Sequence, residues 1–236
     1  MLRKIPAITA AFGLSIFLAA STSSIAGAAT YPAMAPLAQY DTVSQAAEIA
    51  LARSAAPASI SNSARILVLG KHGYETAAKG GRGDKGGNGF VCLVERSWDL
   101  NFNDPEFWNP KIRSPQCFNA AGARSILPRY LERTRWVLAG ESIAEMRAHA
   151  ASGKQRLVPA PGSVCYMMSK QGYLNDSVAG PWHPHVMFFG LHAKPAAWGA
   201  NLPGSPVMAD DTSYSPTTIF MVVVQKWSDG TPNRSM

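Results

Sequence analysis

The stretch Asn88-Gly89-Phe90-Val91-Cys92-Leu93-Val94 decides the fold that this sequence predicts. Its first two residues are a turn dipeptide, and an apolar run that contains a cysteine follows at once. This order is typical of a buried strand that leaves a tight turn. We therefore expect the rest of the chain to pair with this strand and to cover it.

Further apolar runs, bounded by glycine, proline or polar residues, predict the other strands. They span residues 65–69, 74–78, 164–169, 185–189 and 217–225. The last run is apolar without alternation over residues 219–224, which predicts a strand at the centre of the sheet. The glycine-rich residues 80–89 contain the spacing Gly81-x-Gly83-x-x-Gly86 of a dinucleotide-binding loop. A strand follows them instead of a helix, so we interpret them as a hairpin loop.

Helix signals lie between and before these runs. The expected helices span about residues 42–56, 119–138 and 142–151, and each begins with a residue that can cap it: Thr42, Asn119 and Ser142. Pro128 must kink or restart the middle helix. Strands on either side of a helical insert predict an α+β fold. We expect a largely antiparallel sheet of five to six strands, two to three helices and one disulfide.

The first 28 residues have the pattern of a signal peptide. Arg3 and Lys4 precede an apolar run, and small residues that fit a cleavage site follow at Ala26-Gly27-Ala28. The apolar run is too short and too broken for a membrane span, although a retained N-terminal anchor is the alternative. We therefore expect a periplasmic or secreted protein that is not an integral membrane protein after cleavage.

Residues 29–60 are expected to form an N-terminal linker and helix, and residues 61–236 a single α+β domain. Twenty-two Lys and Arg against 15 Asp and Glu give a net charge of +7, and loss of Arg3 and Lys4 leaves +5. A basic balance can indicate nucleic acid, an acidic surface or solubility alone. No dense basic run with interleaved aromatic residues is present, so we expect no nucleic-acid partner.

Three cysteines follow the signal peptide, and in an exported protein two of them are expected to pair. We favour Cys92 with Cys117, because the segment between them is rich in Asn, Asp and Pro and needs to be fastened. Cys165 is then the free thiol. We interpret it as a small buried apolar residue, with a ligand or a nucleophile as the alternative.

The irregular residues 97–115 carry several aromatic side chains that are unfavourable in water. We expect this segment to fold back as a lid over the sheet. Its functional interpretation is a ligand-binding loop, with Trp98, Phe107 and Trp108 as the binding residues.

His183-Pro184-His185 is the sharpest local signal for chemistry. Residues two apart on an extended chain face the same side, so two imidazoles would converge on one point, as a Zn or Cu site requires. His192 or Cys165 would supply a third ligand. A turn in which the pair binds nothing is the alternative interpretation.

A second arrangement pairs Cys165 as nucleophile with His185 as base, with Asp176 or Asp210 orienting the imidazole. No nucleophile elbow or metalloprotease helix motif supports it. The acidic residues are scattered along the chain, and no pair of carboxylates stands out as a general acid and base.

Five short motifs occur in order: AAPASI at residues 55–60, NGFVCLV at 88–94, PQCFN at 115–119, YMM at 166–168 and PHVM at 184–187. Together they resemble a family of exported bacterial proteins of unknown function. The sequence departs from the family pattern at Asn119 and Met168. The resemblance implies pairing of Cys92 with Cys117, and of the two histidines only His185 matches the pattern. It brings no activity with it.

The function that these observations favour is a non-enzymatic binding or interaction domain, whose partner is a small molecule or a protein. The alternative is a metal-binding protein or a metal-dependent enzyme that uses His183 and His185. Zn or Cu is the only cofactor that the residues suggest.

Overall fold

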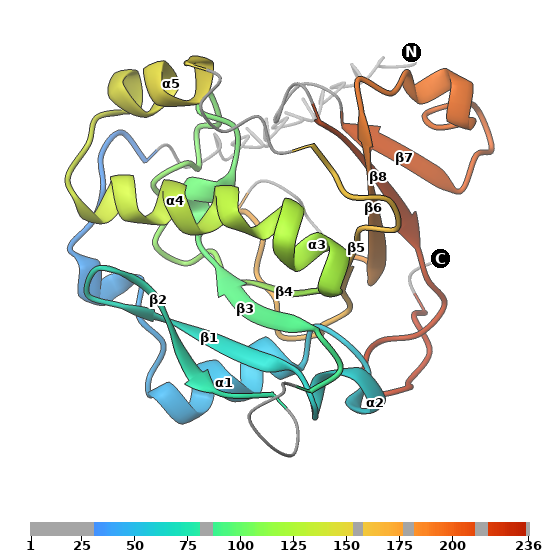
Figure 1. Cartoon of the computed structure of the whole chain (residues 1–236), viewed down its shortest axis with the longest axis horizontal. Helices are drawn as coiled ribbons and strands as arrows, with labels where there is room; N and C mark the ends of the chain where they lie inside the picture. Colours follow the sequence, from blue (N-terminus) through green and yellow to red (C-terminus); the bar gives the residue numbers. More distant parts are fainter. Residues whose placement is uncertain (1–30, 81–86, 153–157, 177–181, 211–216, 235–236) are drawn as a thin grey trace, which may run out of the picture.

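The structure is a computed structural model of the whole chain, and it describes residues 31–80, 87–152, 158–176, 182–210 and 217–234. The predicted signal peptide, residues 1–28, lies outside the described residues. Figure 1 shows one twisted sheet with helices packed on both of its faces.

Eight strands form this sheet in the order β2-β1-β3-β4-β5-β6-β8-β7. Their bounds are β1 Arg65–Gly70, β2 Gly73–Ala78, β3 Val91–Glu95, β4 Ser114–Phe118, β5 Val164–Met167, β6 His185–Leu191, β7 Val207–Asp210 and β8 Thr217–Val223. The pair β1–β3 is parallel and the other six pairs are antiparallel. The α+β class is confirmed, but the described sheet is mixed and larger than the five to six strands predicted.

Strands β4 and β7 are the two that the sequence did not predict. Pro115 and Gln116 interrupt the apolar pattern of β4, and β7 has only four residues. The predicted hairpin is also wrong, because β3 lies beside β1 in parallel and not beside β2. A parallel neighbour cannot be reached through a tight turn. Most of the glycine-rich segment, residues 81–86, lies outside the described residues.

Strand β3 is buried at all five positions, as the opening stretch predicted. The turn before it is held by Asn88, whose side chain accepts from the Phe90 amide at 3.1 Å and donates to the Ile60 carbonyl at 2.7 Å. Gly89 has a φ of +76°, and a Cβ there would lie 2.9 Å from the Ala120 Cβ. Glycine is therefore required where the chain enters β3.

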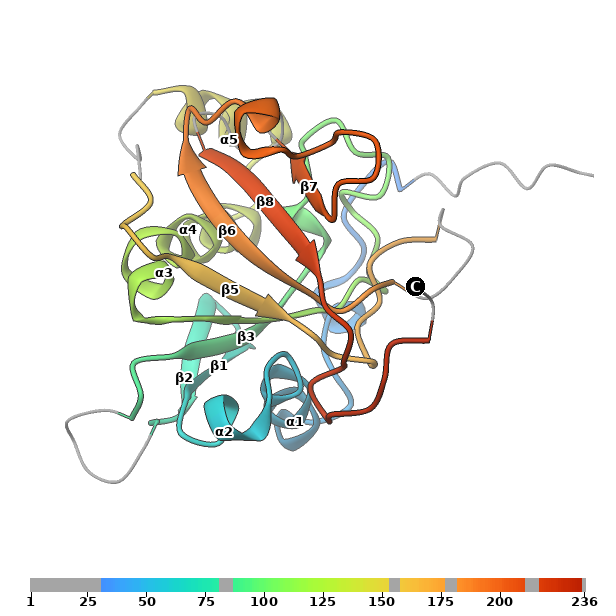
Figure 2. The ribbon, with the colours of Figure 1, turned by 90° about the vertical axis from the view of Figure 1, so that its right-hand side faces the viewer.

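The described residues form five α-helices: α1 Gln45–Arg53, α2 Ala58–Ser61, α3 Ala120–Ser125, α4 Leu127–Leu138 and α5 Ile143–Ala151. Three 3-10 turns, η1 Leu37–Gln39, η2 Ser97–Asp99 and η3 Pro195–Trp198, lie between the other elements. Helices α1 and α2 lie on one face of the β1, β3 and β4 part of the sheet, and α3 and α4 lie on the opposite face (Figures 1 and 2).

The caps of these helices follow the sequence closely. Asn119 caps α3 by accepting from the Gly122 amide, and Ser142 begins α5 in a complete capping box. The first helix is capped by Ser44 and not by Thr42. Pro128 divides the predicted 119–138 helix into α3 and α4, because proline fits only near the start of a helix.

The predicted disulfide joins Cys92 of β3 to Cys117 of β4. The two residues lie directly opposite each other in the antiparallel pair, with their Cα atoms 4.0 Å apart. The bond therefore fastens the centre of the sheet on the face that α1 covers.

Removing this bond in a Cys92→Ala/Cys117→Ala variant is expected to lower the free energy of unfolding by about 3 kcal/mol. The bond closes a loop with a sequence separation of 25, and without it the unfolded chain gains that freedom. Urea unfolding followed by circular dichroism measures the change. A Cys165→Ala variant is the matched control, because it removes a buried sulfur but no cross-link.

The segment predicted as a linker is an integral part of the domain. Tyr40 is fully buried, and its hydroxyl donates to the Trp108 carbonyl at 2.8 Å. Ala52 and Ala55 of the following helix are fully buried against the sheet. The predicted boundary at residue 60 therefore corresponds to no break in packing.

Candidate functional site

The aromatic residues predicted to bind a ligand form part of the core. Trp98, Phe107 and Trp108 are 0%, 1% and 9% exposed and pack with Tyr40 and Met146. The indole of Trp98 donates to the Thr134 hydroxyl at 3.0 Å. These rings stabilise the packing beneath α4 and α5, and they present no binding surface.

The three predicted metal ligands His183, His185 and His192 are not grouped at one point. The Nδ1 atom of His185 lies 2.9 Å from the His183 carbonyl, and the Nδ1 atom of His183 lies 3.4 Å from the Asn233 amide nitrogen. His192 follows the far end of β6, roughly 20 Å along the strand. No three His, Cys, Asp or Glu side chains of the described residues are grouped so as to hold a metal ion.

The free thiol of Cys165 is also poorly suited to nucleophilic chemistry. It is fully buried, and it donates to the side-chain oxygen of Gln116 at 3.3 Å instead of to His185. Burial, together with the charge of Glu95, raises the pKa of the Cys165 thiol well above its usual range. Because the thiolate is the nucleophile, this environment keeps the sulfur inert. Its interpretation as a buried apolar residue fits the structure.

The predicted orienting residue Asp176 has a different role. Its carboxylate accepts hydrogen bonds from Tyr31, Tyr173 and Lys111. The Tyr173 and Tyr31 hydroxyls are the main reason why the pKa of Asp176 falls to about 2. This cluster fastens the start of the described chain to the loop that follows β5. Asp210, the other predicted orienting residue, ends the strand β7.

The structure contains a buried carboxyl pair that the sequence analysis did not predict. Glu95 ends β3 and is 2% exposed, and Asp99 ends the η2 turn and is 5% exposed. Gln116 donates to one oxygen of Glu95. The other Glu95 oxygen and both Asp99 oxygens have no hydrogen-bond partner among the described residues.

The two carboxyl groups are held largely in their neutral forms at low and moderate pH. Burial raises the pKa of Glu95 well above its usual range, and the Asp99 charge adds to this effect. Burial likewise raises the pKa of Asp99 to about 7, although Arg133 and Arg129 of α4 act in the opposite direction. The pair can therefore hold or release a proton near neutral pH.

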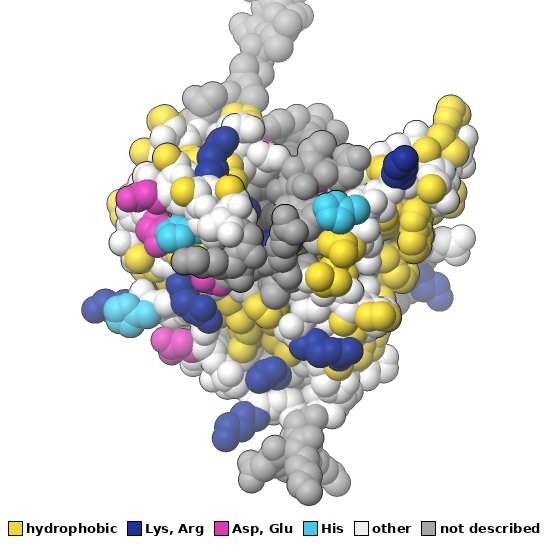
Figure 3. Space-filling view, turned by 45° about the horizontal axis from the view of Figure 1, so that its top comes forward, with side chains coloured by type: hydrophobic (Ala, Val, Ile, Leu, Met, Phe, Trp, Pro, Cys, Tyr) yellow, Lys and Arg dark blue, Asp and Glu magenta, His cyan; other side chains and the backbone are white. Residues whose placement is uncertain are grey.

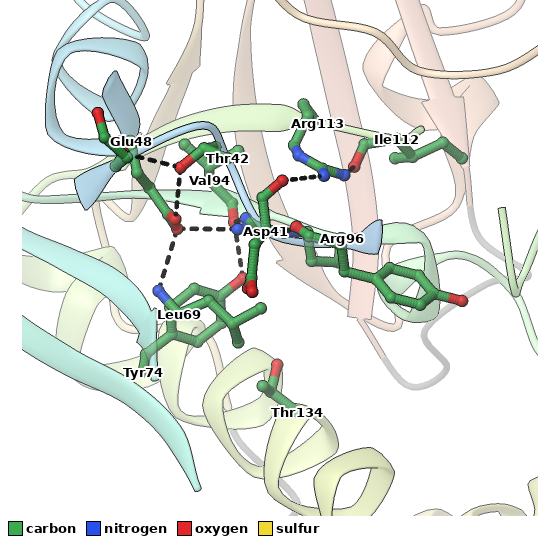
Figure 4. Close-up of polar contacts among 12 residues, drawn as sticks. Asp41, Thr42, Glu48, Leu69, Tyr74, Val94, Arg96, Ile112, Arg113 and Thr134 are labelled. Atoms are coloured by element: carbon green, nitrogen blue, oxygen red, sulfur yellow. Dashed lines mark hydrogen bonds and ion pairs between the residues drawn. The ribbon is translucent and has the colours of Figure 1, made fainter. Parts of the chain in front are cut away.

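A second buried polar cluster joins the first helix to the sheet (Figure 4). The guanidinium of Arg96 donates to Glu48 at 2.9 Å and to the Tyr40 carbonyl at 2.8 Å. Glu48 also accepts from the Leu69 amide at 3.0 Å and from the Thr42 hydroxyl at 3.2 Å. Glu48 thus ties α1 to Arg96 and to the Leu69 amide of β1, and these buried contacts serve packing.

Half of one sheet face has no α-helix of the described residues over it. Helix α1 packs on β1, β3 and β4, but none of the described α-helices lies in front of β5, β6 and β8 (Figure 2). The strand register gives the positions that point to this side. We call them the open face, and they are Val164, Tyr166, Val186, Phe188, Gly190, Val207, Ala209, Thr218, Phe220 and Val222.

The open face is apolar, and none of its ten positions carries a charge. Thr218 and Phe220 are buried beneath the segment that carries η3, and the other eight positions are not. Phe188 lies opposite Phe220 in the sheet and is 41% exposed. Trp198 of η3 stacks on Phe220 with the ring centroids 4.8 Å apart, and its own side chain is 61% exposed. An exposed tryptophan beside an uncharged sheet is typical of an interaction surface.

Exposed apolar side chains are concentrated at this end of the molecule. Among the described residues eight large apolar side chains are exposed, and five of them lie between residues 188 and 208: Phe188, Leu191, Trp198, Leu202 and Met208. Figure 3 shows apolar side chains gathered on the lobe that η3 and β7 form. The strand register points Leu191 and Met208 to the opposite side of the sheet from Phe188, so this end of the molecule exposes apolar side chains on both sheet faces.

The outer edge of β7 is closed by its own chain. Asn201, with a φ of +59°, donates from its side chain to the Ala209 carbonyl and accepts from the Ala209 amide, both at 2.9 Å. Its backbone amide donates to the Val207 carbonyl at 3.0 Å. Any partner at this end must therefore meet the face of the sheet and not the edge of β7.

Within the described parts of the chain, no helix combines the length and the apolar character that a membrane crossing needs. Comparisons with protein-family models, with curated proteins and with solved structures gave no match to this chain. The resemblance to a family of exported proteins stays a prediction.

Proposed function

We propose that this chain is an exported, disulfide-stapled binding domain, periplasmic or secreted, which recognises a protein partner through its open face. The observation that carries the proposal is the uncharged half of the sheet face that no described α-helix covers, with Phe188 exposed on it and Trp198 exposed beside it. A sheet face is stable when another layer buries it, and here the described α-helices cover only half of this face. The disulfide is compatible with an oxidising compartment.

The expected result of replacing Phe188 by a photo-crosslinking amino acid is one discrete adduct with a partner in the cells that produce the protein. The same replacement at Val43, which is 99% exposed before α1, is expected to give none. Gel mobility and mass spectrometry of the adduct provide the readout. Equal adduct patterns at both positions would contradict the proposed role of the open face.

A Phe188→Asp variant tests the same surface without a reagent. It is expected to abolish formation of the complex, because a charge would have to lose its water in an apolar contact. Its free energy of unfolding should change by only about 1 kcal/mol, since the ring is 41% exposed. Val43→Asp is the matched control, and both are compared by size-exclusion chromatography and urea unfolding.

A further inference from the structure

The covered half of this sheet face shows which kind of element packs on the sheet. Over β1, β3 and β4 the layer is α1, whose Ala52 packs with Ile66 and Val94 in one buried cluster. The open face continues the same side of the sheet, and Tyr166 borders that cluster. The fold therefore already places a short helix on the adjoining half of this surface.

The dimensions of the open face match one helix better than a second copy of the chain. Four strands at a spacing of about 4.8 Å span roughly 15 Å, and their lengths are roughly 13 to 23 Å. A helix of about 12 to 14 residues is about 20 Å long and 10 Å wide. A stable protein dimer buries about 800 Å² on each partner, which is more than roughly 300 Å² of open sheet.

The chemistry of the open face further limits which kind of partner segment can bind there. An extended peptide cannot add to β7, because Asn201 already pairs with the outward amide and carbonyl of Ala209. The contacting stripe must be apolar, since the open face carries no charge. The exposed Lys194 and Lys226 follow the ends of β6 and β8, so acidic residues beside that stripe are favoured.

We infer that the occupant of the open face is an amphipathic helix of about three to four turns from a partner protein, with an apolar stripe and acidic flanks. This inference rests on the proposed function and names the partner of that surface. Phe188 and Trp198 act as the anchors between which the apolar stripe lies.

Selection from a displayed library of random peptides of about 16 residues tests the inference without a known partner. The target is the protein purified from the cells that produce it. Enriched sequences are expected to carry apolar residues at i, i+3 or i+4 and i+7, with Asp or Glu beside them. A synthetic copy should bind the Phe188→Asp variant about tenfold more weakly or worse, and Val43→Asp unchanged.

The other outcomes would contradict either the helical partner or the binding surface itself. Enriched peptides with alternating apolar residues would show that an extended segment binds, which overturns the helix and retains the binding surface. No enrichment, with a dimer in sedimentation equilibrium that Phe188→Asp dissociates, would assign the face to a second copy. No enrichment and a monomer at all concentrations would overturn both the helix and the proposed function.

Discussion

An Arg96→Met variant is expected to lose roughly 3 to 5 kcal/mol of stability, because it leaves the buried Glu48 carboxylate without its counter-charge. The side chains of Arg96 and Glu48 are 0% and 5% exposed, so water cannot replace the lost contact. Arg96 also donates to the Tyr40 carbonyl, which would lose a partner as well. The midpoint of urea unfolding, followed by tryptophan fluorescence, measures the effect.

A double-mutant cycle separates the ion pair from its surroundings. Glu48→Met/Arg96→Met removes both charges and is expected to cost clearly less than the sum of the two single changes. Arg65→Met, an exposed position on β1, is the control and should change stability by less than about 0.5 kcal/mol. Additive single effects would mean that the two charges do not stabilise each other.

Asp99→Asn is expected to flatten the dependence of stability on pH between about 4 and 8. Burial raises the pKa of Asp99 in the folded protein to about 7. A carboxyl with a raised folded pKa favours folding below its unfolded pKa, and this contribution is lost as pH rises through the folded value. The wild type should therefore lose roughly 2 to 4 kcal/mol across this range that the variant keeps.

The comparison must be made as a difference between proteins at each pH. Burial lowers the pKa of His185, so this residue favours folding above its unfolded pKa, an opposite slope that both proteins share. Asp229→Asn is the control, because Lys170 holds the pKa of that exposed carboxyl below its usual range. It should not alter the slope above pH 5. Parallel curves for Asp99→Asn and the wild type would exclude a buried titrating pair.

Local signals predicted much of the fold. The apolar runs placed six of the eight strands, and the capping residues Asn119 and Ser142 located the starts of two helices. The pairing of Cys92 with Cys117 is confirmed. Each of these features depends on residues close together in sequence or on the chemistry of an oxidising compartment.

Long-range pairing was much less predictable. The run that became β8 was expected at the sheet centre because it is apolar on both faces, but it lies beside the edge strand β7. An apolar run indicates that both faces of a strand become buried. It does not indicate which element or molecule buries them. The parallel pair β1–β3 likewise depends on chain contacts that no turn dipeptide reveals.

The candidate sites were the least predictable part. Trp98 and Phe107 were expected to bind a ligand because they lie in an irregular segment, yet they pack in a buried cluster with Val137 of α4 and Met146 of α5. Glu95 and Asp99 were not singled out among the scattered acidic residues, and Asp99 is buried where α4 packs against η2. The one available signal was the position of two acids four residues apart within an otherwise apolar and aromatic stretch.

The closure of the β7 edge by Asn201 lowers the tendency of the protein to aggregate through its strand edges. An unpaired edge strand offers a row of amides and carbonyls on which other chains can stack into fibrils. Here one asparagine side chain already occupies that row at Ala209. This end of the sheet can therefore expose apolar side chains to solvent without offering an open strand edge for amyloid-like growth.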